Sequence, residues 1–126
     1  MIDGDSVDAH TVARVKADIR PGERLMVLLD SSHRRPHVRA ELQAYRELVS
    51  IGSYIVVADG FIRELAVSHH GRNEWPADKP LAAVHDFLTE HAEFRLEVPG
   101  WVFDEIRGIP VGIMTYWPDG WLERIH

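Results

Sequence analysis

The chain has no cysteine, which excludes a disulfide framework and a thiolate metal site. It also lacks any run approaching the roughly 20 apolar residues of a membrane-spanning helix, so we expect no membrane partner. Residues 1–8 are acidic and polar, whereas a secretory signal needs a basic start and an apolar core. Together these absences lead us to expect a cytoplasmic protein.

Positive charge is also scarce, since 14 Lys and Arg stand against 20 Asp and Glu, for a net charge of -6. No basic block and no alternation of aromatic and basic residues suits a phosphate backbone, so we expect no nucleic-acid partner. A length of 126 residues with 45% hydrophobic content provides one modest core. No repeat, low-complexity tract or linker interrupts residues 1–126, which we expect to form a single domain.

Apolar residues recur with the spacing of alternating helices and strands. A stripe at spacings of three and four predicts a helix over residues 8–19. Two continuous apolar runs, at residues 25–29 and 54–57, are typical of strands that are covered on both faces. A second apolar stripe predicts a helix between them, from Pro36 to the glycine at position 52. Strand, helix and strand in this order favour an α/β fold with a right-handed crossover on a parallel sheet.

The later part of the chain is less regular. Residues 61–79 carry the pair His69 and His70 and resemble a surface loop, which makes this segment a candidate lid. Adjacent residues in a loop point apart, so the two histidines are a poor ligand pair. Three further elements are predicted: a helix that begins at Pro80, a half-exposed strand over 94–98, and a last strand over 111–116 with a turn at 117–120.

Polar residues follow the two buried strands. Asp30 and His33 come after the first strand, and Asp59 comes after the second. Ligands of open α/β sheets bind beyond the carboxyl ends of the strands, so these residues stand where chemistry is expected. An alternative is that both aspartates are turn or cap residues that accept backbone hydrogen bonds. Similarly, His33 and His37 are alternatively solvated residues at the start of a helix.

Three segments in combination resemble a known family. They are LLDSSHRRPHV at residues 28–38, ELVSIGSYIVVADG at 47–60 and MTYWPDGWLERI at 114–125. The chain resembles the cephalosporin hydroxylase and macrolide-sugar O-methyltransferase family from the GDS at residues 4–6 nearly to its end. The resemblance implies part of a Rossmann-like class I methyltransferase sheet. Parallel strands would be followed by an antiparallel C-terminal hairpin, with helices on both faces.

The resemblance also implies roles for individual residues. Asp30 matches a magnesium ligand of the family and Asp59 matches another, while His33 matches the general base. Ala58 stands where the family has a further acid, so a third metal ligand is missing under this comparison. Asp5 and the serine that follows it, Ser6, match a segment that contacts the adenine of S-adenosylmethionine.

The function implied is S-adenosylmethionine-dependent, magnesium-assisted O-methylation of a hydroxyl on a small natural product or sugar. Magnesium prefers oxygen ligands and keeps several waters, so two carboxylates and substrate hydroxyls suit it. A metal-bound hydroxyl is more acidic, and a histidine can take its proton.

The resemblance covers only the C-terminal half of such an enzyme, because no glycine-rich turn follows a strand before Asp30. The alternative is a non-catalytic remnant, or a domain for oligomerisation or binding, which Ala58 and Gly60 favour. The apolar strand at residues 25–29 would then be an open edge. We therefore expect a homo-oligomer or a second chain that supplies the missing half, through this edge or the aromatic C-terminal hairpin.

Overall fold

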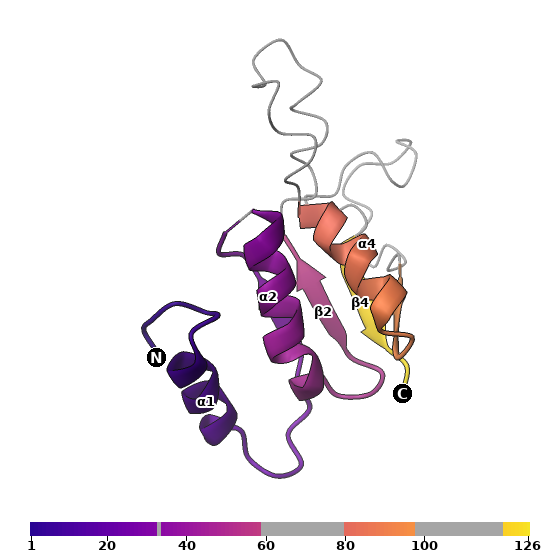
Figure 1. Cartoon of the computed structure of the whole chain (residues 1–126). Helices are drawn as coiled ribbons and strands as arrows, with labels where there is room; N and C mark the ends of the chain where they lie inside the picture. Colours follow the sequence, from indigo (N-terminus) through magenta and orange to yellow (C-terminus); the bar gives the residue numbers. More distant parts are fainter. Residues whose placement is uncertain (33, 59–79, 98–119) are drawn as a thin grey trace, which may run out of the picture.

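The computed structural model describes residues 1–32, 34–58, 80–97 and 120–126 (Figure 1). These residues form a mixed α/β structure, as the sequence predicts. The elements, in chain order, are helix α1 (Ala9–Asp18), strand β1 (Val27–Leu29), helix α2 (Arg35–Tyr45), the 3-10 turn η1 (Arg46–Leu48), strand β2 (Tyr54–Val57), helix α4 (Pro80–Glu90), strand β3 (Phe94–Leu96) and strand β4 (Trp121–Arg124).

The described strands form one four-stranded sheet in the order β1-β2-β4-β3. β1 and β2 are parallel, with Leu29 opposite Val57, whereas β4 is antiparallel to both β2 and β3. This arrangement confirms the partial methyltransferase sheet with an antiparallel pair from the C-terminal part. β4 follows the expected turn and was not predicted as a strand, and the strand expected over 111–116 lies outside the described residues.

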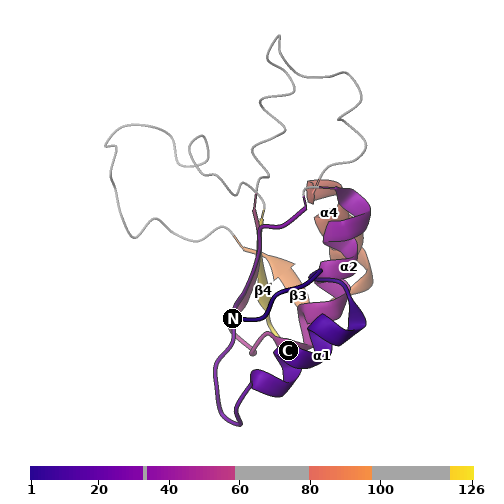
Figure 2. The same ribbon diagram turned by 90° about the vertical axis from the view of Figure 1, so that its left-hand side faces the viewer.

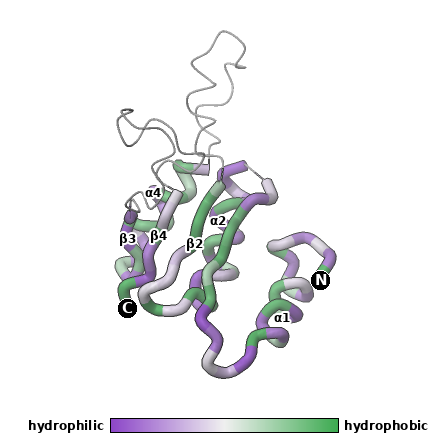
Figure 3. The backbone as a smooth tube through the Cα atoms, turned by 180° about the vertical axis from the view of Figure 1, so that it is seen from behind, coloured by the Kyte–Doolittle hydropathy of each residue, from purple (hydrophilic) through white to green (hydrophobic). Residues whose placement is uncertain are grey.

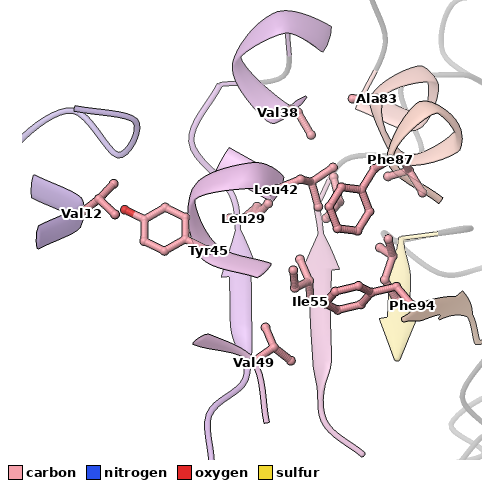
Figure 4. Close-up of a cluster of buried hydrophobic side chains, with 13 residues drawn as sticks. Val12, Leu29, Val38, Leu42, Tyr45, Val49, Ile55, Ala83, Phe87 and Phe94 are labelled. Carbon is pink, nitrogen blue, oxygen red and sulfur yellow. The ribbon is translucent and has the colours of Figure 1, made fainter. Parts of the chain in front are cut away.

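The core lies between the sheet and the helices on one of its faces. Among the described helices, α2 and α4 cover the same face of the sheet (Figure 2). Leu42, Ile55 and Phe87, from α2, β2 and α4, are fully buried there (Figure 4). Their contact excludes water from the largest apolar side chains of all three elements, which is the main stabilising contribution to this layer.

Ion pairs fasten α2 to α4 along the solvent side of this contact. Arg35 donates to the carboxylate of Asp86 at 2.6 Å, and Arg39 donates to Glu90 at 2.5 Å, one turn further along α2. All four side chains are partly exposed, so each pair contributes at most about 1 kcal/mol. The pairs therefore fix which turns of the helices face each other rather than supplying most of the stability.

The first helix occupies a different position. α1 lies beyond the β1 edge of the sheet, alongside α2 (Figure 1), and Val12 packs against Tyr45 (Figure 4). The carboxylate of Asp8 caps α1 by accepting the backbone N–H groups of His10 and Thr11. α1 thus begins at a defined residue, directly after the segment that carries Asp5 and Ser6.

The open edge predicted for the first strand is present in the described part of the chain, where β1 has one strand neighbour. The strand is shorter than predicted, and its side chains alternate. Leu29 faces the core, while Met26 and Leu28 are 56% and 55% exposed. Seen from behind, β1 and β2 form a mostly hydrophobic pair (Figure 3). Within the described ranges, no helix is long and apolar enough to cross a membrane.

Candidate functional site

The segment at residues 4–7 forms a tight turn that leads into α1. Gly4 has a φ of +148°, and a Cβ atom there would lie 2.5 Å from the hydroxyl oxygen of Thr11. The carboxylate of Asp5 accepts a hydrogen bond from the backbone N–H of Val7 at 3.1 Å. The glycine is therefore required by its backbone conformation and by the close approach of Thr11.

Ser6, Ser31, His37 and Glu41 meet in one group, which we call the serine–carboxylate cluster. Both serine hydroxyls donate to Oε1 of Glu41, each at 2.6 Å. The same hydroxyl oxygens lie 3.1 and 3.3 Å from Nε2 of His37, respectively. The cluster joins the segment before α1, the turn after β1 and the first two turns of α2.

Glu41 lies within the cluster because of its place on the buried face of α2. It follows Val38 by three residues and precedes Leu42 and Tyr45, the other residues of that face. The residue is only 1% exposed. A carboxylate in this position is stable only with hydrogen-bond donors or positive charge close by. Ser6 and Ser31 satisfy Oε1, whereas no described residue donates to Oε2.

Tyr45 also binds the segment at residues 4–7. Its hydroxyl donates to the backbone carbonyl of Ser6 at 2.6 Å. Burial raises the pKa of Tyr45 above 10.0, and the negative charges of Glu41 and Asp5 raise it further. The phenol consequently remains a protonated donor at any physiological pH.

Asp30 stands at the carboxyl end of β1 and is exposed. Beside it, the backbone N–H of Ala58 donates to the carbonyl of Leu29 at 2.9 Å. Leu29 and Ala58, which directly precede Asp30 and Asp59 in the sequence, are therefore neighbours at the carboxyl ends of β1 and β2. Asp59 itself and His33 lie outside the described residues.

The donor chemistry at Asp30 fits a hard cation such as magnesium, because an exposed carboxylate oxygen at a strand end leaves room for water ligands. No group of three or more His, Asp or Glu side chains suited to a metal occurs within the described ranges. A site built on Asp30 would thus be completed by residues outside those ranges, by water or by substrate.

A groove of about 440 Å³ runs between α1 and β1. Its walls are mostly apolar, and its polar lining consists of Ser6, Asp30, Ser31, Glu41 and the tyrosine at position 45. The structure therefore brings two of the predicted site residues, Ser6 and Asp30, to one groove. Asp5 precedes Ser6 and is exposed.

Three residues of this site were missed by the sequence analysis, namely Ser31, Glu41 and the polar role of Tyr45. A signal for Glu41 was present, because a carboxylate occupies a position of an otherwise apolar helical stripe. For Ser31, the sequence offered no signal other than its position next to Asp30.

Comparison with known proteins places the chain in a family. The family model described as rhamnosyl O-methyltransferase/CmcI matches residues 1–125. The searches of curated proteins and of solved structures each gave no match. The match extends over every element of the sheet and over the whole serine–carboxylate cluster, and it supports an O-methyltransferase function and the use of S-adenosylmethionine that such transfer generally entails. The chain belongs to the rhamnosyl O-methyltransferase/CmcI family.

Proposed function

We propose that this chain takes part in magnesium-assisted methyl transfer from S-adenosylmethionine to a hydroxyl of a small natural product or sugar. The observation that carries the proposal is the shared groove at the carboxyl end of β1. It is lined by Asp30, a candidate metal ligand, and by Ser6, which belongs to the candidate cofactor segment. The two residues come from separate parts of the sequence and meet where α/β sheets bind their ligands.

Asp30 and Asp59 are the proposed magnesium ligands. The hydrogen bond from Ala58 to Leu29 supports this pairing, since each proposed ligand directly follows one of these two neighbours. Two carboxylates balance the charge of the cation, and water or substrate oxygens would complete its octahedral shell. The exposure of Asp30 leaves its oxygens accessible for such binding.

His33 is the proposed general base. When bound, S-adenosylmethionine would supply an electrophilic methyl group and magnesium would acidify the substrate hydroxyl. His33 would accept the proton that the substrate hydroxyl loses when it takes up the methyl group. His33 follows Asp30 by three residues in the sequence, which is the spacing of the base in the family that the chain resembles.

Asp5 and Ser6 are the proposed cofactor contacts. The hydroxyl of Ser6 is held by Glu41 and its carbonyl by Tyr45, so Ser6 would act mainly by placing the backbone of its segment. Asp5 is exposed and retains carboxylate lone pairs beyond the one used by Val7, which makes it the better side-chain acceptor.

The proposed partner is a second copy of this chain. β1 presents unpaired backbone groups at the edge of the described sheet, and Met26 and Leu28 are exposed there. Pairing of two such edges across a two-fold axis would satisfy these backbone groups and cover both side chains. A different polypeptide that supplies further strands would satisfy the same edge.

One observation favours a second candidate function, that of a non-catalytic binding or oligomerisation domain. Ala58 stands where the resemblance expects an acid, and its side chain is a buried methyl group, 4% exposed. Ala58 therefore contributes no ligand to a metal at the carboxyl ends of β1 and β2.

Calorimetric titration with S-adenosylmethionine, with and without magnesium, separates the two functions. Methyl transfer predicts saturable binding, a dependence of substrate turnover on magnesium, and weaker binding by Asp5→Ala. Asp3→Ala, an exposed acidic residue two positions earlier, is the matched control. Absence of cofactor binding at millimolar concentration would leave the binding-domain function and refute the enzymatic one.

A further inference from the structure

The hydrogens of the serine–carboxylate cluster can be counted. Each serine hydroxyl has a single hydrogen, and both hydrogens point to Oε1 of Glu41. The oxygens of Ser6 and Ser31 can then only accept a hydrogen bond from His37. Nε2 of His37 must therefore carry a hydrogen, which it shares between the two hydroxyls.

The cluster also joins two segments that have no other described hydrogen bond between them. Ser6 follows Asp5 directly, and Ser31 follows Asp30 directly. One oxygen of Glu41 binds both serines, so the carboxylate fixes the distance between the candidate cofactor segment and the candidate metal ligand. Glu41 itself is rigidly placed, because it is buried in the middle of α2.

We propose that Glu41 is a positioning residue, which aligns the cofactor segment with the metal-binding strand end through Ser6, Ser31 and the Nε2–H of His37. The inference rests on the proposed function for its consequence in binding. The alignment itself is independent of that function. Glu41 acts through its neighbours, because its carboxylate is enclosed and both donors on Oε1 belong to the protein.

The burial of Glu41 also shows why a simple packing role is insufficient. A leucine or methionine would fill the same place on α2 without the cost of removing a carboxylate from water. The unsatisfied Oε2 adds to that cost. The nearby imidazole of His37, 3.6 Å from Oε1, offsets it when it carries positive charge.

Two variants separate alignment from packing. Glu41→Gln keeps an oxygen that accepts from both serines, whereas Glu41→Met has similar length and only a weakly accepting thioether sulfur. Ring-nitrogen NMR of His37 above neutral pH should show hydrogen on Nε2 in the parent and in Glu41→Gln. In Glu41→Met the freed hydroxyls can donate to Nε2, so the hydrogen should move to Nδ1.

Amide hydrogen exchange provides the second measurement. Exchange at Val7 and at Asp8, whose backbone amides donate to Asp5, should accelerate in Glu41→Met, while the amides of β2 should keep the parent's protection. Uniform acceleration that includes β2 would indicate general destabilisation, which would contradict a local positioning role.

The third measurement is calorimetric titration with S-adenosylhomocysteine. We expect affinity to fall about tenfold in Glu41→Met, the equivalent of one hydrogen bond to a charged group, and to stay within about threefold in Glu41→Gln. A parent that binds no S-adenosylhomocysteine would refute the proposed function, while the NMR and exchange measurements would still test the alignment. An unprotonated Nε2 in the parent, or equal affinity in the parent and Glu41→Met, would overturn the inference.

Discussion

Tyr45 donates a hydrogen bond across 2.6 Å to the backbone carbonyl of Ser6, so a side chain of α2 holds the segment in front of α1. Tyr45 also packs on Val12 within the core. The contact thus couples the placement of α1 to the candidate cofactor segment. Its loss should lower stability, because this bond ties α2 to the segment together with the contacts of Glu41 and His37 to the Ser6 hydroxyl.

Tyr45→Phe keeps the aromatic ring and removes only the hydroxyl. We expect the free energy of unfolding to fall by about 1 kcal/mol, the usual net contribution of a hydrogen bond. Urea denaturation followed by circular dichroism measures this change. Equal midpoints for the parent and the variant would show that the carbonyl of Ser6 gains an equivalent partner from water.

Tyr45→Phe should also change how the stability of the protein depends on pH in alkaline solution. Because the pKa of Tyr45 is raised above 10.0 in the folded state, folding favours the neutral phenol. Its contribution to stability is complete below pH 10.0 and declines as the pH rises through the raised pKa. The parent should therefore lose stability relative to Tyr45→Phe in that range, and parallel profiles would contradict this assignment.

Gly4→Ala should destabilise the segment that carries Asp5 and Ser6. The variant combines a φ of +148° with a Cβ atom 2.5 Å from the hydroxyl of Thr11, so we expect a loss of about 1–3 kcal/mol. Gly22→Ala is the control, since it shares a positive φ but meets no atom within 4 Å. Adding Thr11→Ala should restore part of the loss only in the Gly4 variant. Thermal unfolding of the parent, of both single glycine variants and of both double variants measures these differences.

Removal of both proposed metal ligands should abolish specific magnesium binding. We expect the double variant Asp30→Ala, Asp59→Ala to show no saturable heat in a magnesium titration, whereas the parent binds weakly because water provides most ligands. Asp18→Ala, on the exposed surface of α1, controls for the loss of charge. A titration curve for the double variant that overlays the parent's would remove these aspartates from the site.

His33→Ala should abolish methyl transfer and leave magnesium binding intact, because the histidine is proposed to take a proton and not to hold the metal. Turnover is measured as the amount of S-adenosylhomocysteine that is released. The neighbouring exposed residue Arg34 provides a control in Arg34→Ala. Turnover equal to that of the parent would exclude His33 as the base.

Self-association through β1 should depend on its exposed apolar side chains. We expect the parent to exceed monomer mass in gel filtration with light scattering, and Leu28→Lys to shift it toward the monomer by placing a charge at the edge. Ile51→Lys, which alters another exposed apolar residue outside the strand, should have no such effect. A parent that is monomeric and melts cooperatively at micromolar concentration would contradict the proposed dimer.

The helices and the two parallel strands were predictable because each carries its own pattern. The apolar stripe on α2 and the uninterrupted apolar residues of β2 can be recognised within the segment itself, and both predict buried residues. β4 has no such pattern, since only Leu122 among its residues is fully buried and the strand is decided by its neighbours on both sides. Pattern methods detect local periodicity, and β4 is specified by contacts distant in sequence.

The candidate site divides in the same way. Asp30 was predictable from its place after a strand, and Asp5 and Ser6 from the family resemblance. The serine–carboxylate cluster was not predictable from the sequence. Ser6 and Glu41 are 35 positions apart, and no local pattern in either segment indicates that they are in contact. A buried acid within an apolar stripe predicts a partner, but only the fold identifies which one.

The position of β4 bears on how the chain acquires its structure during synthesis. β4 lies between β2 and β3, both of which precede it in the sequence. On the ribosome, β3 therefore has no described strand to pair with until residues 121–124 have emerged. Until then the nascent chain carries two separated strand edges, a form prone to association with other chains. Pairing of β3 into the described sheet therefore has to wait for residues 121–124, and chaperones that shield apolar strands would act on the earlier strands until then.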